Sequence, residues 1–213
     1  DSITKLEGSF KKTKSGLLQL YSAGIPVQIS CPVMKQNKDS FLEVVQWGRR
    51  HCIAVAVEPL IFAAYDHSGS NLANRLSLEE LGEAVNKQLS EEYAEMMREI
   101  AREKEKLTGD SPICSICRYK LCISANGDVF PCVGWQTNTI GNLNRQSLRE
   151  IWETSEKIRN LRQIKWERFP LCVVCEDRGY CTVCMMCNSN ENLDGDAFRV
   201  NDFRCKAASI IHH

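Results

Sequence analysis

The stretch Cys172-Val-Val-Cys175-Glu-Asp-Arg-Gly-Tyr-Cys181-Thr-Val-Cys184-Met-Met-Cys187 decides how the second half of this chain folds. It places five cysteines within sixteen residues, in a loop that also carries Asp, Arg and Gly. Core packing gives no reason to repeat a small thiol every three residues through such a polar loop, whereas Cys-x2-Cys pairs are a common source of metal ligands. The stretch therefore predicts that this part of the protein folds around metal.

Five further cysteines surround this loop: Cys114, Cys117, Cys122, Cys132 and Cys205. Together the ten residues are enough for two complete four-thiolate sites. Spacing alone leaves zinc and iron–sulfur open, because both accept tetrahedral sulfur ligands. A disulfide framework is less favoured, since such frameworks belong to small secreted domains. Cys31 and Cys52 lie apart, in apolar surroundings, and are expected in the core.

The composition gives no sign of a charged or lipid partner. Lys plus Arg and Asp plus Glu both number 27 in 213 residues, so no global field favours nucleic acid or a membrane surface. No apolar stretch approaches the roughly 20 residues that span a bilayer, and the first residues do not have the order of a signal peptide. We expect a cytoplasmic protein. The basic run from Arg102 to Lys106 is expected to be a solvated helix face.

Helical and strand patterns alternate through the first hundred residues. Apolar periodicity predicts helices over 8–24 and 37–51, and a third opens at the capping box Ser77-Leu-Glu-Glu80 and continues to about Leu107. Apolar runs over 25–33 and 52–64 predict strands between them. This order predicts an α/β layer with a parallel sheet. Two parallel strands make a poor sheet alone, so we expect the beginning of this domain to be missing.

A β-hairpin is predicted over 118–132, because Asn126-Gly127 favours a two-residue type I′ turn. That register places Cys117 on the face of Cys132 and leaves Cys122 on the other face as a packed thiol. A slip by one residue would reverse the assignment. A second capping box, Ser147-Leu-Arg-Glu150, predicts a helix that reaches about residue 161.

The whole cysteine pattern resembles the SPASM extension of radical SAM enzymes. The residues that carry the likeness are Cys114 and Cys117 before Gly127-x4-Cys132, then Cys172-x2-Cys175-x5-Cys181, then Cys205. The passages Ile140-Gly-Asn-Leu143 and 190–196 are similar to the family's usual sequence. Upstream, residues 1–4, 8–10 and 24–27, with Asn37, resemble the later strands and helices of the radical SAM partial barrel in peptide-modifying members.

This resemblance implies a fold of class α/β. Residues 1–108 would be the C-terminal half of a partial (β/α) radical SAM barrel, and residues 109–213 a small cysteine-rich α+β SPASM domain. Glu58 interrupts the second apolar strand, at the end where α/β folds place their active sites. Glu58 and Asn37 are therefore the candidates for a place near S-adenosylmethionine (AdoMet) or substrate.

SPASM domains carry two auxiliary [4Fe-4S] clusters, so the resemblance also implies ligand sets. One cluster would be held by Cys172, Cys175, Cys181 and Cys205. The other would be held by Cys114, Cys117 and Cys132 and completed by a cysteine near the end of the loop. The family's next cysteine would fall on Met185, so Cys184 and Cys187 compete for that place.

The activity that the resemblance implies is radical modification of a ribosomally made precursor peptide, with a thioether or carbon–carbon crosslink as product. A sulfatase-type maturase that oxidises Cys or Ser to formylglycine is the alternative. A non-enzymatic iron–sulfur electron-transfer module or zinc-binding module is the alternative of another class. Expected partners are the precursor peptide and a donor such as flavodoxin or ferredoxin.

The Cys-x3-Cys-x2-Cys motif that binds the catalytic cluster of radical SAM enzymes does not occur in this sequence. A third, AdoMet-binding cluster is therefore expected in an N-terminal half that is missing here or is supplied by another chain. This chain alone is expected to be inactive.

Overall fold

The computed structural model describes residues 1–88 and 91–212. They form two compact units, one built from Asp1–Ile61 and Asn74–Gln88 and the other from Phe62–Ala73 and Leu89–His213. The short 3-10 helix η1, Ser70–Asn74, lies where the chain returns from the second unit to the first. The division into domains at residues 108 and 109 stays a prediction.

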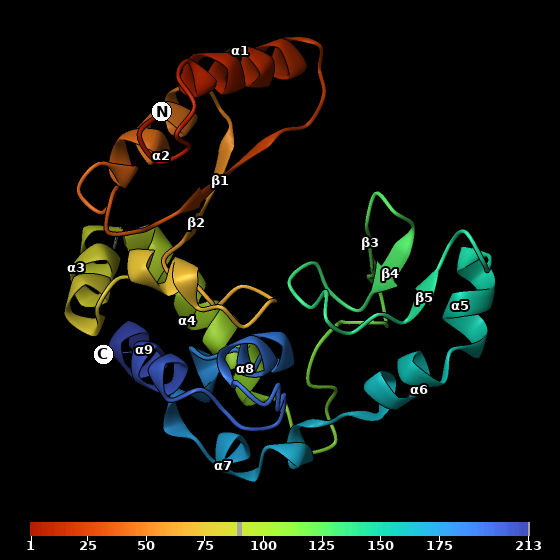
Figure 1. Cartoon of the computed structure of the whole chain (residues 1–213). Helices are drawn as coiled ribbons and strands as arrows, with labels where there is room; N and C mark the ends of the chain where they lie inside the picture. Colours follow the sequence, from red (N-terminus) through yellow and green to blue (C-terminus); the bar gives the residue numbers. More distant parts are fainter. Residues whose placement is uncertain (89–90, 213) are drawn as a thin grey trace. The chain divides into compact units, whose positions relative to one another are not determined.

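The first unit is built on two parallel strands (Figure 1). β1 (Gln28–Pro32) pairs with β2 (Ala54–Glu58), with Gln28 opposite Ala54. The crossover between them is α2 (Phe41–Arg50), which follows α1 (Ser9–Ser22) and β1 in the chain. The predicted order of helix, strand, helix and strand and the parallel pairing are confirmed.

The predicted strand over 52–64 is longer than the observed one. β2 ends at Glu58 because Pro59 follows it, and proline has no N–H with which to continue a ladder. The two strands are only half-buried, although their apolar runs predicted cover on both faces. Within the described residues this sheet contains two strands.

The capping box at Ser77 is confirmed and opens α3 (Leu78–Gln88). The N–H of Glu80 donates to Ser77 Oγ at 3.1 Å, and the N–H of Ser77 donates to Glu80 Oε2 at 2.9 Å. The sequence predicted one helix to about Leu107. Its remaining described part is α4 (Glu91–Glu105), which belongs to the second unit, and Leu89 lies outside the described residues.

A small antiparallel sheet forms one part of the second unit. Its strands are β3 (Cys122–Ile123), β4 (Asp128–Phe130) and β5 (Gly141–Asn142), and β4 lies in the middle. The predicted helix after Ser147 is present in two pieces, α5 (Leu148–Thr154) and α6 (Glu156–Gln163). Ser155 separates them because its side chain caps the N-terminus of α6.

The hairpin register predicted from Asn126-Gly127 is wrong by one residue. Cys122 pairs with Phe130, where the sequence predicted Pro131 as its partner. A type I′ turn needs positive φ at both central residues, but only Gly127 has one, at 82°. The loop therefore spans three residues, and the N–H of Ser124 donates to Asp128 O at 2.9 Å. Cys122 thus shares the strand face of Phe130, and the reason for assigning it to the opposite face from Cys132 is removed.

The cysteine-rich region contains short helices that the sequence did not predict. They are η2 (Trp166–Arg168), α7 (Pro170–Val173), η3 (Glu176–Gly179), α8 (Met185–Glu191) and α9 (Asp202–His212). Two of their side chains, Trp166 and Met185, join residues from the neighbouring segments in a core that contains Ile113, Ile116, Trp135, Trp166, Phe169, Val183, Met185 and Ala197. Among the described residues, no helix has the length and apolarity that a membrane crossing requires.

Two glycines in helices of the first unit allow a test of its packing. A Cβ added to Gly48 of α2 would lie 2.8 Å from Ile53 O and would collide with the Val55 side chain on β2. We expect Gly48→Ala to lower the free energy of unfolding by about 1–3 kcal/mol. A Cβ added to Gly16 of α1 meets nothing within 4 Å. The control Gly16→Ala should be neutral or stabilise by up to about 1 kcal/mol. Urea unfolding of both variants measures the difference, and equal stabilities would contradict the packing.

Candidate metal centre

The cysteine-rich loop is wound into single turns that share a three-residue period. The N–H of Cys172 donates to Phe169 O at 2.9 Å, and that of Cys175 donates to Cys172 O at 3.4 Å. The same spacing recurs from Arg178 to Cys175 O, at 3.3 Å, and from Cys181 to Arg178 O, at 3.3 Å. The intervals of three and six residues between these cysteines match that period, so their side chains can reach one space.

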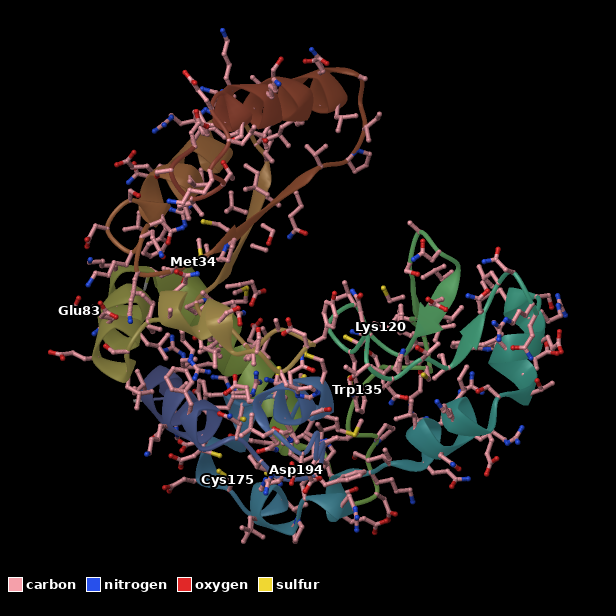
Figure 2. All side chains as sticks on the ribbon, viewed as in Figure 1. Met34, Glu83, Lys120, Trp135, Cys175 and Asp194 are labelled. Atoms are coloured by element: carbon pink, nitrogen blue, oxygen red, sulfur yellow. The ribbon has the colours of Figure 1, made fainter. Side chains whose placement is uncertain are left out.

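Five cysteines line one cavity of about 60 Å³, here called the cysteine pocket: Cys172, Cys175, Cys181, Cys184 and Cys205. A single water needs only about 10–15 Å³ of such space, so the pocket has room for a larger group. Cys175, which is labelled in Figure 2 and follows α7 directly, is exposed, as is Cys205 on α9. One edge of the pocket therefore opens to solvent.

The thiols of the cysteine pocket act on one another electrostatically. Burial and, after it, the neighbouring Cys181 raise the pKa of Cys172 to about 11, with Cys205 and Cys175 adding to the rise. Burial also raises the pKa of Cys181, against the effect of the nearby Arg204. Several thiolates at this place repel one another, so the charged forms that bind metal need a cation among them.

Cys184 and Cys187 form a coupled pair at the start of α8. The hydrogen bond from Cys187, which is 1% exposed, is the main cause that lowers the pKa of Cys184 to about 6. The same bond raises the pKa of Cys187. Cys184 lies at the N-cap of α8 and lines the cysteine pocket, and Cys187 lies behind it in the core. The structure thus places these two competing cysteines in direct contact.

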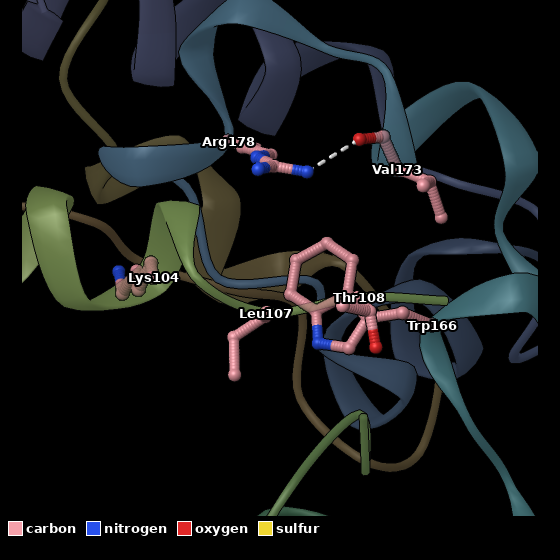
Figure 3. A pocket seen from close by; sticks show the side chains of 6 residues that line it. All are labelled: Lys104, Leu107, Thr108, Trp166, Val173 and Arg178. Atoms are coloured by element: carbon pink, nitrogen blue, oxygen red, sulfur yellow. Dashed lines mark hydrogen bonds between the residues drawn. The ribbon is translucent and has the colours of Figure 1, made fainter. Parts of the chain in front are cut away.

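Side chains from η2, η3 and α4 pack beside the cysteine pocket. Figure 3 shows Trp166, Arg178 and Lys104 around a smaller pocket, with the hydrogen bond from Arg178 Nη1 to Val173 O at 2.7 Å. Trp166 and Arg178 also line the cysteine pocket. Gly179 of η3 allows α4 to approach, because a Cβ there would lie 2.9 Å from Ala101 Cβ. Helix α4 is thereby fixed against the loop that carries Cys175 and Cys181.

The second predicted ligand group lies near the small sheet. Cys114 and Cys132 pack against the apolar core that contains Trp135. Cys117 is 0% exposed and lies in a left-handed turn with φ of 54°. Burial raises its pKa to about 11, with Arg162 acting to lower it and Cys114 acting to raise it. Cys114 and Cys117 are therefore neighbours, and the parity argument does not apply to Cys117, because it lies in a turn outside β3.

The two candidate residues of the first unit lie at the ends of its strands. Asn37 uses its whole amide to close the turn after β1: Oδ1 accepts from the N–H of Met34 at 2.7 Å, and Nδ2 donates to Pro32 O at 3.0 Å. Glu58 is exposed at the last position of β2, opposite Pro32. A place for either residue near AdoMet or substrate stays a prediction.

Two positively charged side chains lie beside the cysteine pocket. The sequence did not identify Arg204, and it predicted a solvated position for Lys104. Arg204 is 9% exposed and lines the pocket, but its only signal in the sequence is its position next to Cys205. Lys104 was expected on a solvated helix face. Instead Nζ donates to Cys181 O at 3.1 Å and to Thr182 Oγ1 at 3.2 Å, and burial lowers its pKa. The expectation failed because α4 packs this face against η3, which helical periodicity alone did not reveal.

Comparison with known proteins agrees with this geometry. Residues 114–188 match the family model SPASM, described as an iron–sulfur cluster-binding domain. A curated relative, the AdoMet-dependent heme synthase of Methanosarcina barkeri (strain Fusaro / DSM 804), is 24% identical over 211 residues, which cover 86% of this chain and 58% of the relative.

Two solved structures have the same fold. Native anSMEcpe with bound AdoMet and Cp18Cys peptide matches with a TM-score of 0.63 at 16% identity, over 95% of this chain and 59% of that chain. Native anSMEcpe with bound AdoMet matches with a TM-score of 0.61 at 14% identity, over 95% of this chain and 58% of that chain. The chain thus spans less than two thirds of the length of these proteins. Residues 114–188 thus match the SPASM iron–sulfur cluster-binding domain, and the chain shares its fold with part of anSMEcpe.

Proposed function

We propose that this chain is the auxiliary-cluster part of a radical SAM enzyme, with one [4Fe-4S] cluster bound in the cysteine pocket. The observation that carries the proposal is the pocket itself, which gathers the cysteines of one expected ligand set: Cys172, Cys175, Cys181 and Cys205. They lie on two separate stretches of chain, the cysteine-rich loop and α9. A bound group would therefore join these stretches.

The geometry of the pocket favours a cluster over a single metal ion. Four thiolates around one Zn²⁺ lie about 3.8 Å apart, given a Zn–S bond of about 2.3 Å. Within the described ranges, no three Cys, His, Asp or Glu side chains lie close enough to hold one ion. A cubane places iron and sulfide between its ligands and needs a wider set. Soft thiolate donors around a cavity of about 60 Å³ fit that requirement.

A second cluster is proposed beside the small sheet, with Cys114, Cys117 and Cys132 as ligands. Its support is the electrostatic contact between Cys114 and Cys117 and the packing of Cys114 and Cys132 on one core. The fourth ligand is Cys184 or Cys187. These two thiols share a hydrogen bond, and Cys184 lines the cysteine pocket whereas Cys187 does not.

Bound clusters of this kind relay electrons. The residues around a cluster influence its reduction potential. Trp166 and Phe169 keep water away from the inner side of the pocket, where Cys172 packs against them. Arg204 and Lys104 bring positive charge to the same place. The chain thereby controls burial and charge, the two properties through which a protein tunes a cluster.

For the complete protein we propose that the substrate is a peptide, modified by a crosslink or, in the alternative, by oxidation of Cys or Ser. Its support is the shared fold with anSMEcpe, which was solved with a bound peptide. The relative that is a heme synthase favours a second candidate, a tetrapyrrole substrate. In either case residues 1–108 would form the end of the barrel and residues 109–213 the SPASM domain. The setting would be cytoplasmic, with a flavodoxin-like or ferredoxin-like donor.

Metal analysis tests the cluster assignment directly. After anaerobic reconstitution, two cubanes predict about 8 iron and 8 sulfide per chain. We expect Cys175→Ser to lower both values by about half, because it removes one ligand of one cluster. Cys52→Ser is the matched control, since Cys52, contrary to the expectation that it lies in the core, is also exposed and belongs to the first unit. Full iron in Cys175→Ser, or zinc without sulfide in the unmodified chain, would overturn the assignment.

The second cluster has its own test in the hairpin. We expect Cys117→Ser to lose about half of the iron, because Cys117 is an assigned ligand next to Cys114. Cys122→Ser, only five residues away, should keep the full content. Iron and sulfide assays on the two variants decide between them. If the losses were exchanged, Cys122 would be the ligand and the assignment of Cys117 would be wrong.

The substrate class is tested with the complete enzyme, AdoMet and a reductant under anaerobic conditions. A precursor peptide encoded beside the gene should lose two hydrogen atoms per crosslink, as seen by mass spectrometry, and a Cys175→Ser form should give less product. The parallel reaction with a tetrapyrrole is the comparison. Turnover of the tetrapyrrole with an unchanged peptide would favour the second candidate.

A further inference from the structure

Arg204 is a buried cation placed among thiols. It lies on α9, directly before Cys205, and lines the cysteine pocket with 9% of its surface exposed. A guanidinium is permanently charged at any pH at which proteins are stable. Removing such a charge from water costs several kcal/mol unless an opposite charge accompanies it. The position of Arg204 therefore requires an anion nearby.

The side chain is held in one orientation by three contacts. Nη2 donates to Thr182 O at 2.5 Å, and Nη1 donates to Cys187 Sγ at 3.5 Å. The guanidinium carbon lies 4.8 Å from the centre of the Phe62 ring, in cation–π geometry. One of these partners is a neutral carbonyl and one an aromatic ring, so neither can balance the charge. The guanidinium is thus fixed, with Nη1 directed at the buried Cys187, the partner of the pocket-lining Cys184.

Asp177 lines the same pocket but is paired with His212, and the other groups there that can carry negative charge are the cysteine thiols. In the part of the chain that the structure describes, no carboxylate forms an ion pair with Arg204. Arg204 lines the same cavity as Cys181, Cys184 and Cys205, and its Nη1 donates to Cys187 Sγ. Four thiolates carry more negative charge than a cubane core carries positive charge, so a ligated cluster is an anion. A cluster in the pocket would supply the charge that Arg204 needs.

We propose that Arg204 is the fixed counter-ion of the cluster in the cysteine pocket and raises its reduction potential. The inference rests on the proposed function. Reduction adds one negative charge to an anion that is already there, so a cation at short range stabilises the reduced cluster more than the oxidised one. Arg204 is a positioning residue, because it acts through charge and hydrogen bonds on the ligands. The second cluster would respond less, since three of its proposed ligands, Cys114, Cys117 and Cys132, do not line the pocket that Arg204 lines, and only its fourth ligand, Cys184 or Cys187, lies near the guanidinium.

Three variants separate the charge of Arg204 from its hydrogen bonds. Arg204→Lys keeps the charge and loses the planar fork, Arg204→Gln keeps a donor and loses the charge, and Arg204→Met keeps only the bulk. Each reconstituted chain is titrated with reductant and followed by electron paramagnetic resonance. We expect one of the two reductive transitions to move to a lower potential in the Gln and Met variants, by at least tenfold in the reduced-to-oxidised ratio, or about 59 mV for one electron. The Lys variant should stay near the unmodified chain, and in every variant the other transition should move less, because Arg204 lies near only one ligand of the second cluster.

Iron and sulfide are measured in every sample before titration. An unmodified chain without iron would refute the proposed function itself. If the unmodified chain is loaded, unchanged potentials in Arg204→Gln and Arg204→Met would refute the role of Arg204 alone. Equal shifts in all three variants, or loss of iron in all three, would assign Arg204 to structural support and would also overturn the proposal.

Discussion

Thiolates repel one another, and this chain nevertheless gathers five cysteines around one cavity. Burial and mutual repulsion raise the pKa values of Cys172, Cys181 and Cys205, so this arrangement of thiols by itself favours their neutral forms. The ligand form needs positive charge in the middle of the set. The fold around the pocket consists of single turns and short helices, which do not hold such a set together by themselves. The cluster proposed for this pocket would supply the charge and would also join the loop to α9, so that metal binding and folding would become one process.

The sequence predicted the regular elements whose signals are local. The order of helices and strands in the first unit, the parallel pairing of β1 with β2 and the capping boxes at Ser77 and Ser147 are all confirmed. These features depend on periodicity within one segment or on side chains three residues apart. The same locality explains the prediction for Asn126-Gly127, which was wrong because Asn126 did not adopt the positive φ that its residue type permits. One dihedral angle moved the register of the whole hairpin.

In the candidate site, the sequence predicted the cysteines but not the charged side chains around them. Cys172, Cys175, Cys181 and Cys205 could be grouped from spacing and family resemblance, and the structure brings all four to one cavity. Nothing in the pattern distinguished Arg204 from the chain's other arginines, because its importance comes from burial and from the elements packed around it. Lys104 is a similar case: its charge was visible, but its burial depends on the approach of α4 to Gly179. The electrostatics of the site depends on packing between segments that are far apart in the sequence. Local sequence patterns do not predict this packing.

The position of Cys205 has a consequence for biosynthesis. The loop with its first three pocket cysteines is complete when residue 181 has been made, but α9 follows only after another twenty residues. A ribosome therefore presents an incomplete ligand set together with hydrophobic surface such as Phe169, which becomes buried in the finished fold. With Cys205 as the proposed fourth ligand, insertion of the cluster would have to follow the synthesis of α9, and until then the thiols of the loop would lack the partner that completes their set.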